Sequence, residues 1–177
     1  AQIVNSTDLQ GKTDAEILAG VKSGDLTVEE YLFAAESLAK NSEEQAAILA
    51  AAAKKYNNDA RVWNNLGVAL TKCGEPAAAL KAFEQAAKQD SSSELNKNLM
   101  LANLANGKTA EAKKYAAGAD AEAKAALAAA EGNYKAAAAL EGYNAAIVAY
   151  MNNDLAAAKK AIAKETTADA DYLRAVI

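Results

Sequence analysis

Apolar side chains recur along most of the chain at the three- and four-residue spacing of an amphipathic helix, and short polar or glycine-containing breaks separate the runs. Ile17, Leu18 and Val21 share one face of the first run, and no run alternates as a strand would. The pattern therefore predicts an all-α protein. The predicted helices span about 13–22, 27–40, 43–55, 60–73, 76–88, 120–131, 134–140, 143–152 and 155–164, and a last one begins near 167.

Start and stop signals support these bounds. Thr13 with Glu16 and Thr27 with Glu30 fit capping boxes, in which a hydroxyl and a carboxylate each accept a hydrogen bond from an unpaired backbone N–H. Gly74 and Pro76 lie between two predicted helices, because glycine favours a helix C-terminus and proline is tolerated in a first turn.

The breaks also show a period. Gly107 lies 33 residues after Gly74, and Asn41 lies 33 residues before it. After Gly118 the spacing shortens, since Gly107 and Gly132 are only 25 residues apart. A period of this length is typical of proteins built from stacked helical repeats, in which no single repeat can bury its own apolar face.

One repeat is complete. Small residues at Gly67 and Ala79 allow two helices to approach closely, and large apolar residues fill the space between them. The pattern consists of Trp63, Leu66, Gly67, Leu70, Ala79, Phe83 and Ala86. It resembles the tetratricopeptide repeat family, although Leu70 stands where an aromatic residue is usual and Ser91 where proline is common. The resemblance implies a tetratricopeptide-like α-α superhelix, a solenoid of antiparallel helix pairs.

The predicted organisation is an extended lead-in at 1–12 and a single helical-repeat domain at 13–177. Within that domain the best repeat is 60–93, the degenerate repeats are 27–59 and 94–118, the shortened helix pairs occupy 119–164, and an unfinished repeat occupies 167–177. The last helix carries apolar residues up to Ile177, so we expect a longer natural protein to continue past this residue.

Composition supports helices packed closely through small side chains. Alanine, the best helix former, is abundant, whereas the chain contains one proline and few aromatic residues. The 19 basic and 23 acidic residues are intermixed, so nucleic acid is not an expected partner. The apolar runs are too short to span a bilayer.

Candidate chemistry is sparse. The chain has no histidine, and its lone cysteine, Cys73, is interpreted as a small packing residue rather than a reactive thiol. Paired carboxylates such as Glu29 and Glu30 lie in first turns, where they favourably face the helix dipole. We therefore predict no enzyme activity, no cofactor and no metal site.

The resemblance implies that a ligand would lie on the inner surface formed by the first helix of each pair. The residues placed there are Tyr31, Arg61, Asn64, Val68, Thr71 and Lys97. A clamp for a terminal carboxylate, known in chaperone-binding members of this family, is not expected, because Val68 and Leu101 stand where polar residues would be needed. A competing hypothesis has Ile17, Leu18 and Val21 cover this groove.

Two functions follow. The first is a non-enzymatic protein–protein interaction scaffold that binds a peptide or protein and is a monomer. The alternative is a structural or assembly segment of a larger bacterial cell-envelope protein, because the repeats resemble in style those of Bacteroidetes-type exported proteins. The second hypothesis favours the periplasm or cell envelope over the cytoplasm.

Overall fold

The computed structural model describes residues 11–137 and 142–176. These residues form helices joined by turns, and none of them lies in a strand. The all-α, helical-repeat prediction is confirmed. The predicted lead-in at 1–12 falls mostly outside the described residues. The chain divides into two compact units, Ala1–Asn106 and Gly107–Ile177.

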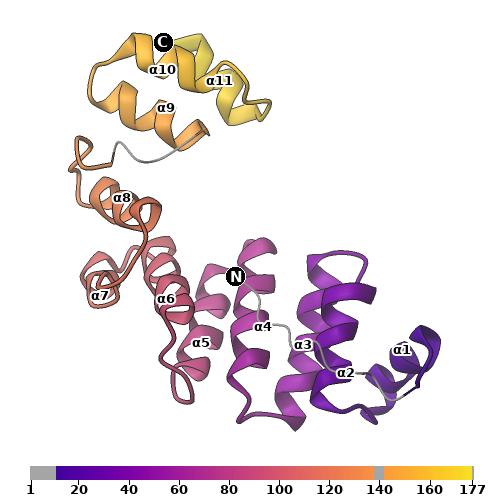
Figure 1. Ribbon diagram of the computed structural model, residues 1–177. Coiled ribbons are helices and arrows are strands. Elements are labelled where there is room, and N and C mark those ends of the chain that lie inside the picture. The colour runs from indigo at the N-terminus through magenta and orange to yellow at the C-terminus, as the bar shows by residue number, and fades with distance from the viewer. Residues whose placement is uncertain (1–10, 138–141, 177) are drawn as a thin grey trace. The chain divides into compact units, whose positions relative to one another are not determined.

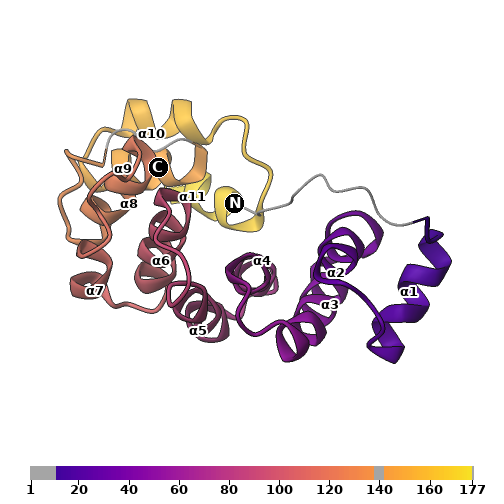
Figure 2. The same ribbon diagram turned by 60° about the horizontal axis from the view of Figure 1, so that its bottom comes forward.

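The first unit stacks its helices side by side in chain order (Figures 1 and 2). Two antiparallel pairs are followed by the first helix of a third layer. The elements are α1 (Asp14–Ser23), α2 (Val28–Phe33), η1 (Ala34–Leu38), α3 (Ser42–Lys55), α4 (Ala60–Lys72), α5 (Pro76–Ala86) and α6 (Ser93–Ala105). Helix α2 continues directly into η1, and together they pair with α3 as α4 pairs with α5.

Both predicted capping boxes are present. The Thr27 hydroxyl accepts a hydrogen bond from the Glu30 N–H at 3.2 Å, and Glu30 Oε2 accepts one from the Thr27 N–H at 2.9 Å. Thr13 and Glu16 make the same reciprocal pair at the start of α1. These caps satisfy backbone donors that a helix start would otherwise leave unpaired.

The C-terminal end of the first helix in the first pair differs from the prediction. A regular helix was expected over 27–40, but its last turn, η1, is a π-helical turn in which the Ala39 N–H donates to the Ala34 carbonyl at 2.9 Å. The wider turn is accommodated because Ala34 and Ala35 are small, and both are buried.

A continuous apolar core runs through the first unit from α1 to α5. It contains Ile17, Leu26, Tyr31, Leu32, Ile48, Leu49, Val62, Leu66 and several alanines. Tight packing between α4 and α5 depends on Gly67, because a Cβ atom there would lie 2.6 Å from the Phe83 ring. The predicted roles of Gly67 and Phe83 are thus seen in the structure. Trp63 is only partly buried at the edge of this core, and its indole N–H donates to the Asn57 carbonyl at 2.8 Å.

The second unit has shorter helices: α7 (Thr109–Lys113), α8 (Ala121–Ala130), α9 (Gly142–Met151), α10 (Leu155–Ile162) and α11 (Ala168–Val176). A helix was predicted at 134–140. Residues 134–137 form turns instead, and 138–140 lie outside the described residues. Ala146, Ile162, Ala170 and Leu173 make a small core that joins α9, α10 and α11. Whether 13–177 acts as a single domain stays a prediction.

Candidate functional site

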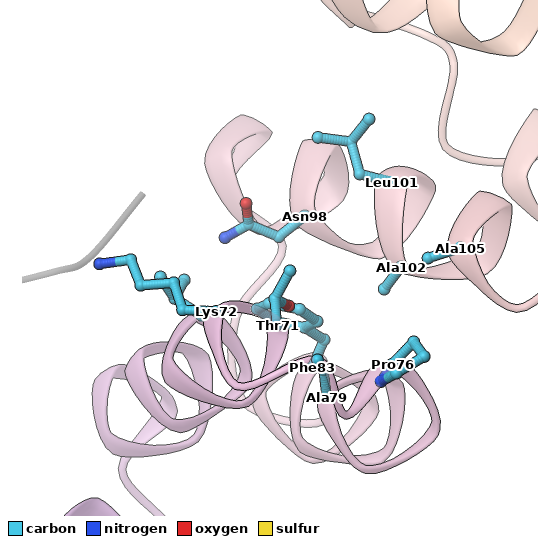
Figure 3. A pocket seen from close by; sticks show the side chains of 11 residues that line it. Thr71, Lys72, Pro76, Ala79, Phe83, Asn98, Leu101, Ala102 and Ala105 are labelled. Atoms are coloured by element: carbon cyan, nitrogen blue, oxygen red, sulfur yellow. The ribbon is translucent and has the colours of Figure 1, made fainter. Parts of the chain in front are cut away.

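A pocket of about 590 Å³ opens between α4, α5 and α6 in the first unit (Figure 3). We call it the apolar groove. Its lining consists of Val68, Thr71, Lys72, Gly74, Pro76, Ala79, Phe83, Asn98, Leu101, Ala102 and Ala105. Most of these side chains are apolar, and the volume is within the range of pockets that hold small ligands or a few side chains of a partner.

The groove has a buried base and an exposed wall. The Phe83 side chain is 3% exposed, whereas Leu101 on α6 is 37% exposed, which is unusual for a large apolar residue in this unit. Small side chains at Ala79 and Ala105 leave the space between base and wall open. An exposed leucine beside an open apolar pocket is a feature of interaction sites.

The Thr71 hydroxyl and the asparagine amides near the groove form hydrogen bonds within the protein. The Thr71 hydroxyl donates to the Gly67 carbonyl at 2.9 Å. The Asn98 amide donates from Nδ2 to Asn64 Oδ1 at 2.8 Å, so it joins α6 to α4, and the Asn64 Nδ2 donates to Asn65 Oδ1 at 3.4 Å. All three asparagines are buried. This chain of amides fixes the spacing of the two helices that form the groove.

Tyr31 is one of the predicted groove residues, and the structure places it in the core. It is 1% exposed, and its ring meets that of Tyr56 edge to face with centroids 6.2 Å apart. Tyr56 in turn donates its hydroxyl to the Leu26 carbonyl at 2.7 Å. Both tyrosines therefore hold α2 and α3 together.

Arg61 was predicted to face a partner, and the structure places it in an ion-pair network. Its guanidinium bonds Asp59 Oδ2 at 2.7 Å and Glu29 Oε1 at 2.9 Å. Hydrogen bonds to Asp59 are the main reason that the pKa of Arg61 is raised. Burial raises the pKa of Asp59, but the bonds and charge of Arg61 outweigh it, so the net pKa of that carboxyl is lowered. The network ties the start of α4 to α2.

The remaining predicted residues divide into two groups. Val68 and Thr71 both line the apolar groove. Asn64 is buried and bonded to Asn98, and Lys97 is a half-buried residue of α6; neither belongs to the lining. Binding by the six residues stays a prediction.

The sequence pattern did not mark Phe83 or Ala105 as binding residues, and Leu101 entered only as a position where a carboxylate clamp would need a polar residue. A usable signal was present, because Leu101 lies 33 residues after Val68, one repeat period along the chain.

The groove is not covered by α1. Ile17 is buried in the core beside Leu26, and α1 packs on α2 and η1, at the end of the unit away from α6 (Figures 1 and 2). Leu18 is 38% exposed. Among the described residues, α1 therefore leaves Val68 accessible.

Cys73 lies at the C-terminal end of α4 and is half-buried. Burial raises the pKa of the Cys73 thiol, and the carboxylates of Glu43 and Glu75 raise it further, so the thiol stays protonated near neutral pH. Among the described residues no cluster of three or more potential metal ligands is found. In the same residues, no helix combines the length and apolar character that crossing a bilayer requires.

Comparison with known families matches residues 60–93 to the tetratricopeptide repeat. These residues comprise α4, α5, the loop that follows and the first residue of α6. Helices α4 and α5 provide two of the three sides of the apolar groove. Residues 60–93 form a tetratricopeptide repeat. In this repeat α4 is the first helix and α5 the second, and α6 begins the next layer. A comparison of the whole chain with curated proteins finds no match.

Proposed function

We propose that the chain is a non-enzymatic scaffold that binds a peptide segment of a protein partner in the apolar groove between α4, α5 and α6. Tetratricopeptide repeats commonly mediate protein–protein interaction. The bound segment has an extended backbone and inserts one large apolar side chain between Leu101 and Phe83.

The observation that carries the proposal is the exposed Leu101 beside an open pocket with a buried aromatic base. Apolar area removed from water contributes about 25 cal/mol per Å². Filling the groove with one leucine- or phenylalanine-sized side chain therefore supplies binding energy at a central anchor, as is typical of protein interfaces.

The groove also favours this use because it is already formed. The asparagine chain holds α4 and α6 at a fixed distance, and Gly67 allows close contact of α4 with α5. A preformed site loses little conformational entropy on binding, which increases affinity.

Peptides selected from a displayed random dodecapeptide library on the intact chain provide the test. The selected peptides should contain a recurrent large apolar residue, and Leu101→Glu should weaken their binding at least about tenfold, because it places a charge in the apolar contact. Leu18→Glu is the matched control, since Leu18 is equally exposed but lies on α1. Equal loss with both variants, or binding unaffected by Leu101→Glu, would exclude the groove.

A second function, assembly within a larger bacterial cell-envelope protein, is favoured by one feature of the second unit. Tyr150, Met151 and Leu155 are large apolar residues, and each is more than 40% exposed. Such residues favour self-association. Sedimentation at micromolar concentration distinguishes the two functions: a scaffold is a monomer, and an assembly segment is an oligomer that Met151→Glu should dissociate.

A further inference from the structure

A second pocket, of about 250 Å³, lies one repeat earlier in the first unit, and we call it the polar pocket. It is bounded by η1, the start of α3 and the end of α4. Its lining consists of Ala35, Glu36, Ala39, Lys40, Asn41, Ser42, Gln45 and Lys72. Lys72 belongs to both pockets, so the two sites adjoin at this residue.

The polar pocket is the repeat equivalent of the apolar groove. Adding 33 to Ala35, Ala39, Asn41 and Lys72 gives Val68, Lys72, Gly74 and Ala105, all of which line the groove. The two pockets therefore occupy successive positions on the same surface of the repeat stack. A segment that lies along this surface crosses both.

Gln45 is a buried polar residue in the lining of the polar pocket. Its side chain is 9% exposed, yet its amide makes no hydrogen bond with another residue in the part of the chain described by the structure. A buried amide without a partner costs free energy, which a ligand that accepts its N–H bonds would recover.

Most other polar groups of the pocket are hydrogen-bond donors or carry positive charge. The ammonium groups of Lys40 and Lys72 form no ion pair among the described residues, and the start of α3 adds the positive end of a 14-residue helix. Asn41 Oδ1 already accepts the Glu44 N–H at 2.8 Å, and Glu44 Oε2 accepts the Lys40 N–H at 2.8 Å.

One acidic residue lines the pocket, and two more lie close to it in the sequence. Glu36 lines it, and Glu43 and Glu44 lie in the first turn of α3. Glu44 accepts a hydrogen bond from the Lys40 N–H, and Glu43 does not line the pocket. Glu36 is thus the carboxylate that would repel a bound anion most strongly. Removing its charge therefore tests whether the ligand group is negative or positive.

We propose that the polar pocket binds the carboxylate of an aspartate or glutamate side chain in the same peptide segment whose apolar anchor fills the groove. The inference rests on the proposed function. Lys72 and the Gln45 amide contact the carboxylate beside the start of α3. Helices in contact are roughly 8–10 Å apart, so about three extended residues separate the acidic residue from the anchor.

The test uses the peptides selected on the intact chain, synthesised with blocked N- and C-termini so that only side chains carry charge. They should contain an acidic residue about three positions from the apolar anchor. Replacing that residue by its amide should weaken binding about tenfold, a typical effect of a charge-assisted hydrogen bond. Gln45→Leu should weaken the acidic peptide and leave its amide analogue unchanged. Lys72→Gln alters the lining of both pockets, so it should weaken the acidic peptide by a larger factor than the amide analogue.

Two variants make the result specific. Glu36→Gln should strengthen binding of the acidic peptide, because it removes a negative charge from the pocket. Lys81→Gln, on the exposed part of α5, removes a lysine outside both pockets and should have no effect. Circular dichroism of each variant confirms that the helices are retained.

Several outcomes would overturn the inference. If the peptides show an apolar anchor without an acidic residue, the inference fails and the proposed function stands. If Glu36→Gln weakens binding, the pocket holds a cation. If only a free C-terminal carboxylate restores binding, the pocket binds a peptide terminus and not an acidic side chain. If no peptide is selected, both proposals fail.

Discussion

At the scale of single residues, Gly67 and Phe83 determine how closely α4 and α5 pack. A Cβ atom at position 67 would lie 2.6–2.7 Å from three atoms of the Phe83 ring, closer than any tolerated contact. The ring is 3% exposed and also forms the base of the apolar groove, so stability and binding depend on the same contact.

Gly67→Ala should therefore lower the free energy of unfolding by roughly 1–3 kcal/mol, the usual cost of overpacking. Urea denaturation followed by circular dichroism measures this change. Adding Phe83→Leu should recover part of the loss, because a smaller side chain makes room for the new methyl group. If the losses in unfolding free energy from Gly67→Ala and Phe83→Leu simply add, the contact between the two residues is not what destabilises Gly67→Ala.

Asp59 gives a prediction about pH. Its pKa is lowered in the folded protein because the bonds from Arg61 outweigh the effect of burial. The ionised carboxylate thus stabilises the fold above the unfolded value of about 3.9, and this contribution is lost as the pH falls through the lower folded pKa. Asp59→Asn keeps a residue suited to the N-cap but removes the charge.

Thermal melts between about pH 6 and pH 3 test this point. The wild type should lose more stability over this interval than Asp59→Asn, and the curves should converge at the acidic end. Parallel curves would mean that the Asp59–Arg61 pair does not contribute to folding.

At the scale of elements, the asparagine contact sets the relation of α4 and α6. Asn64 and Asn98 are buried, and the 2.8 Å bond between their amides spans the two helices. A double-mutant cycle with Asn64→Ala and Asn98→Ala should give a coupling energy of about 0.5–1.5 kcal/mol. Additive effects would show that the bond does not hold the groove in shape.

The helices themselves could largely be predicted from the sequence, because their caps and apolar spacing are local properties. Thr13, Thr27 and Asp59 all act as N-caps, and α3, α4 and α5 lie within two residues of their predicted bounds. The π-turn of η1 and the turns at 134–137 could not be predicted, since each depends on packing against other elements.

The site was less predictable for the same reason. Val68 and Thr71 both line the apolar groove, but the repeat register could not show that Arg61 bonds Asp59 and Glu29, or that Tyr31 meets Tyr56. Side-chain partners from other helices decide whether a residue on a given face is free to bind. The repeat period aligns Leu101 with Val68, but only the structure shows that the Leu101 side chain is exposed beside an open pocket.

At the scale of the whole molecule, the two units differ in how much core each contains. The large core from Ile17 to Ala82 lies entirely within the first unit, which also holds both pockets. A fragment of residues 11–106 should therefore melt cooperatively and keep the peptide affinity of the intact chain within about twofold. A fragment that is unfolded by circular dichroism would show that the second unit is needed for folding.

The central claim, that a partner segment binds in the apolar groove, is tested most directly by methyl NMR spectra of the intact chain during titration with a selected peptide. The methyl resonances of Val68 and Leu101 should shift in a saturable way, while those of Leu18 and Leu155, which are as exposed, should not. Shifts confined to Leu18 or Leu155, with Val68 and Leu101 unchanged, would contradict it.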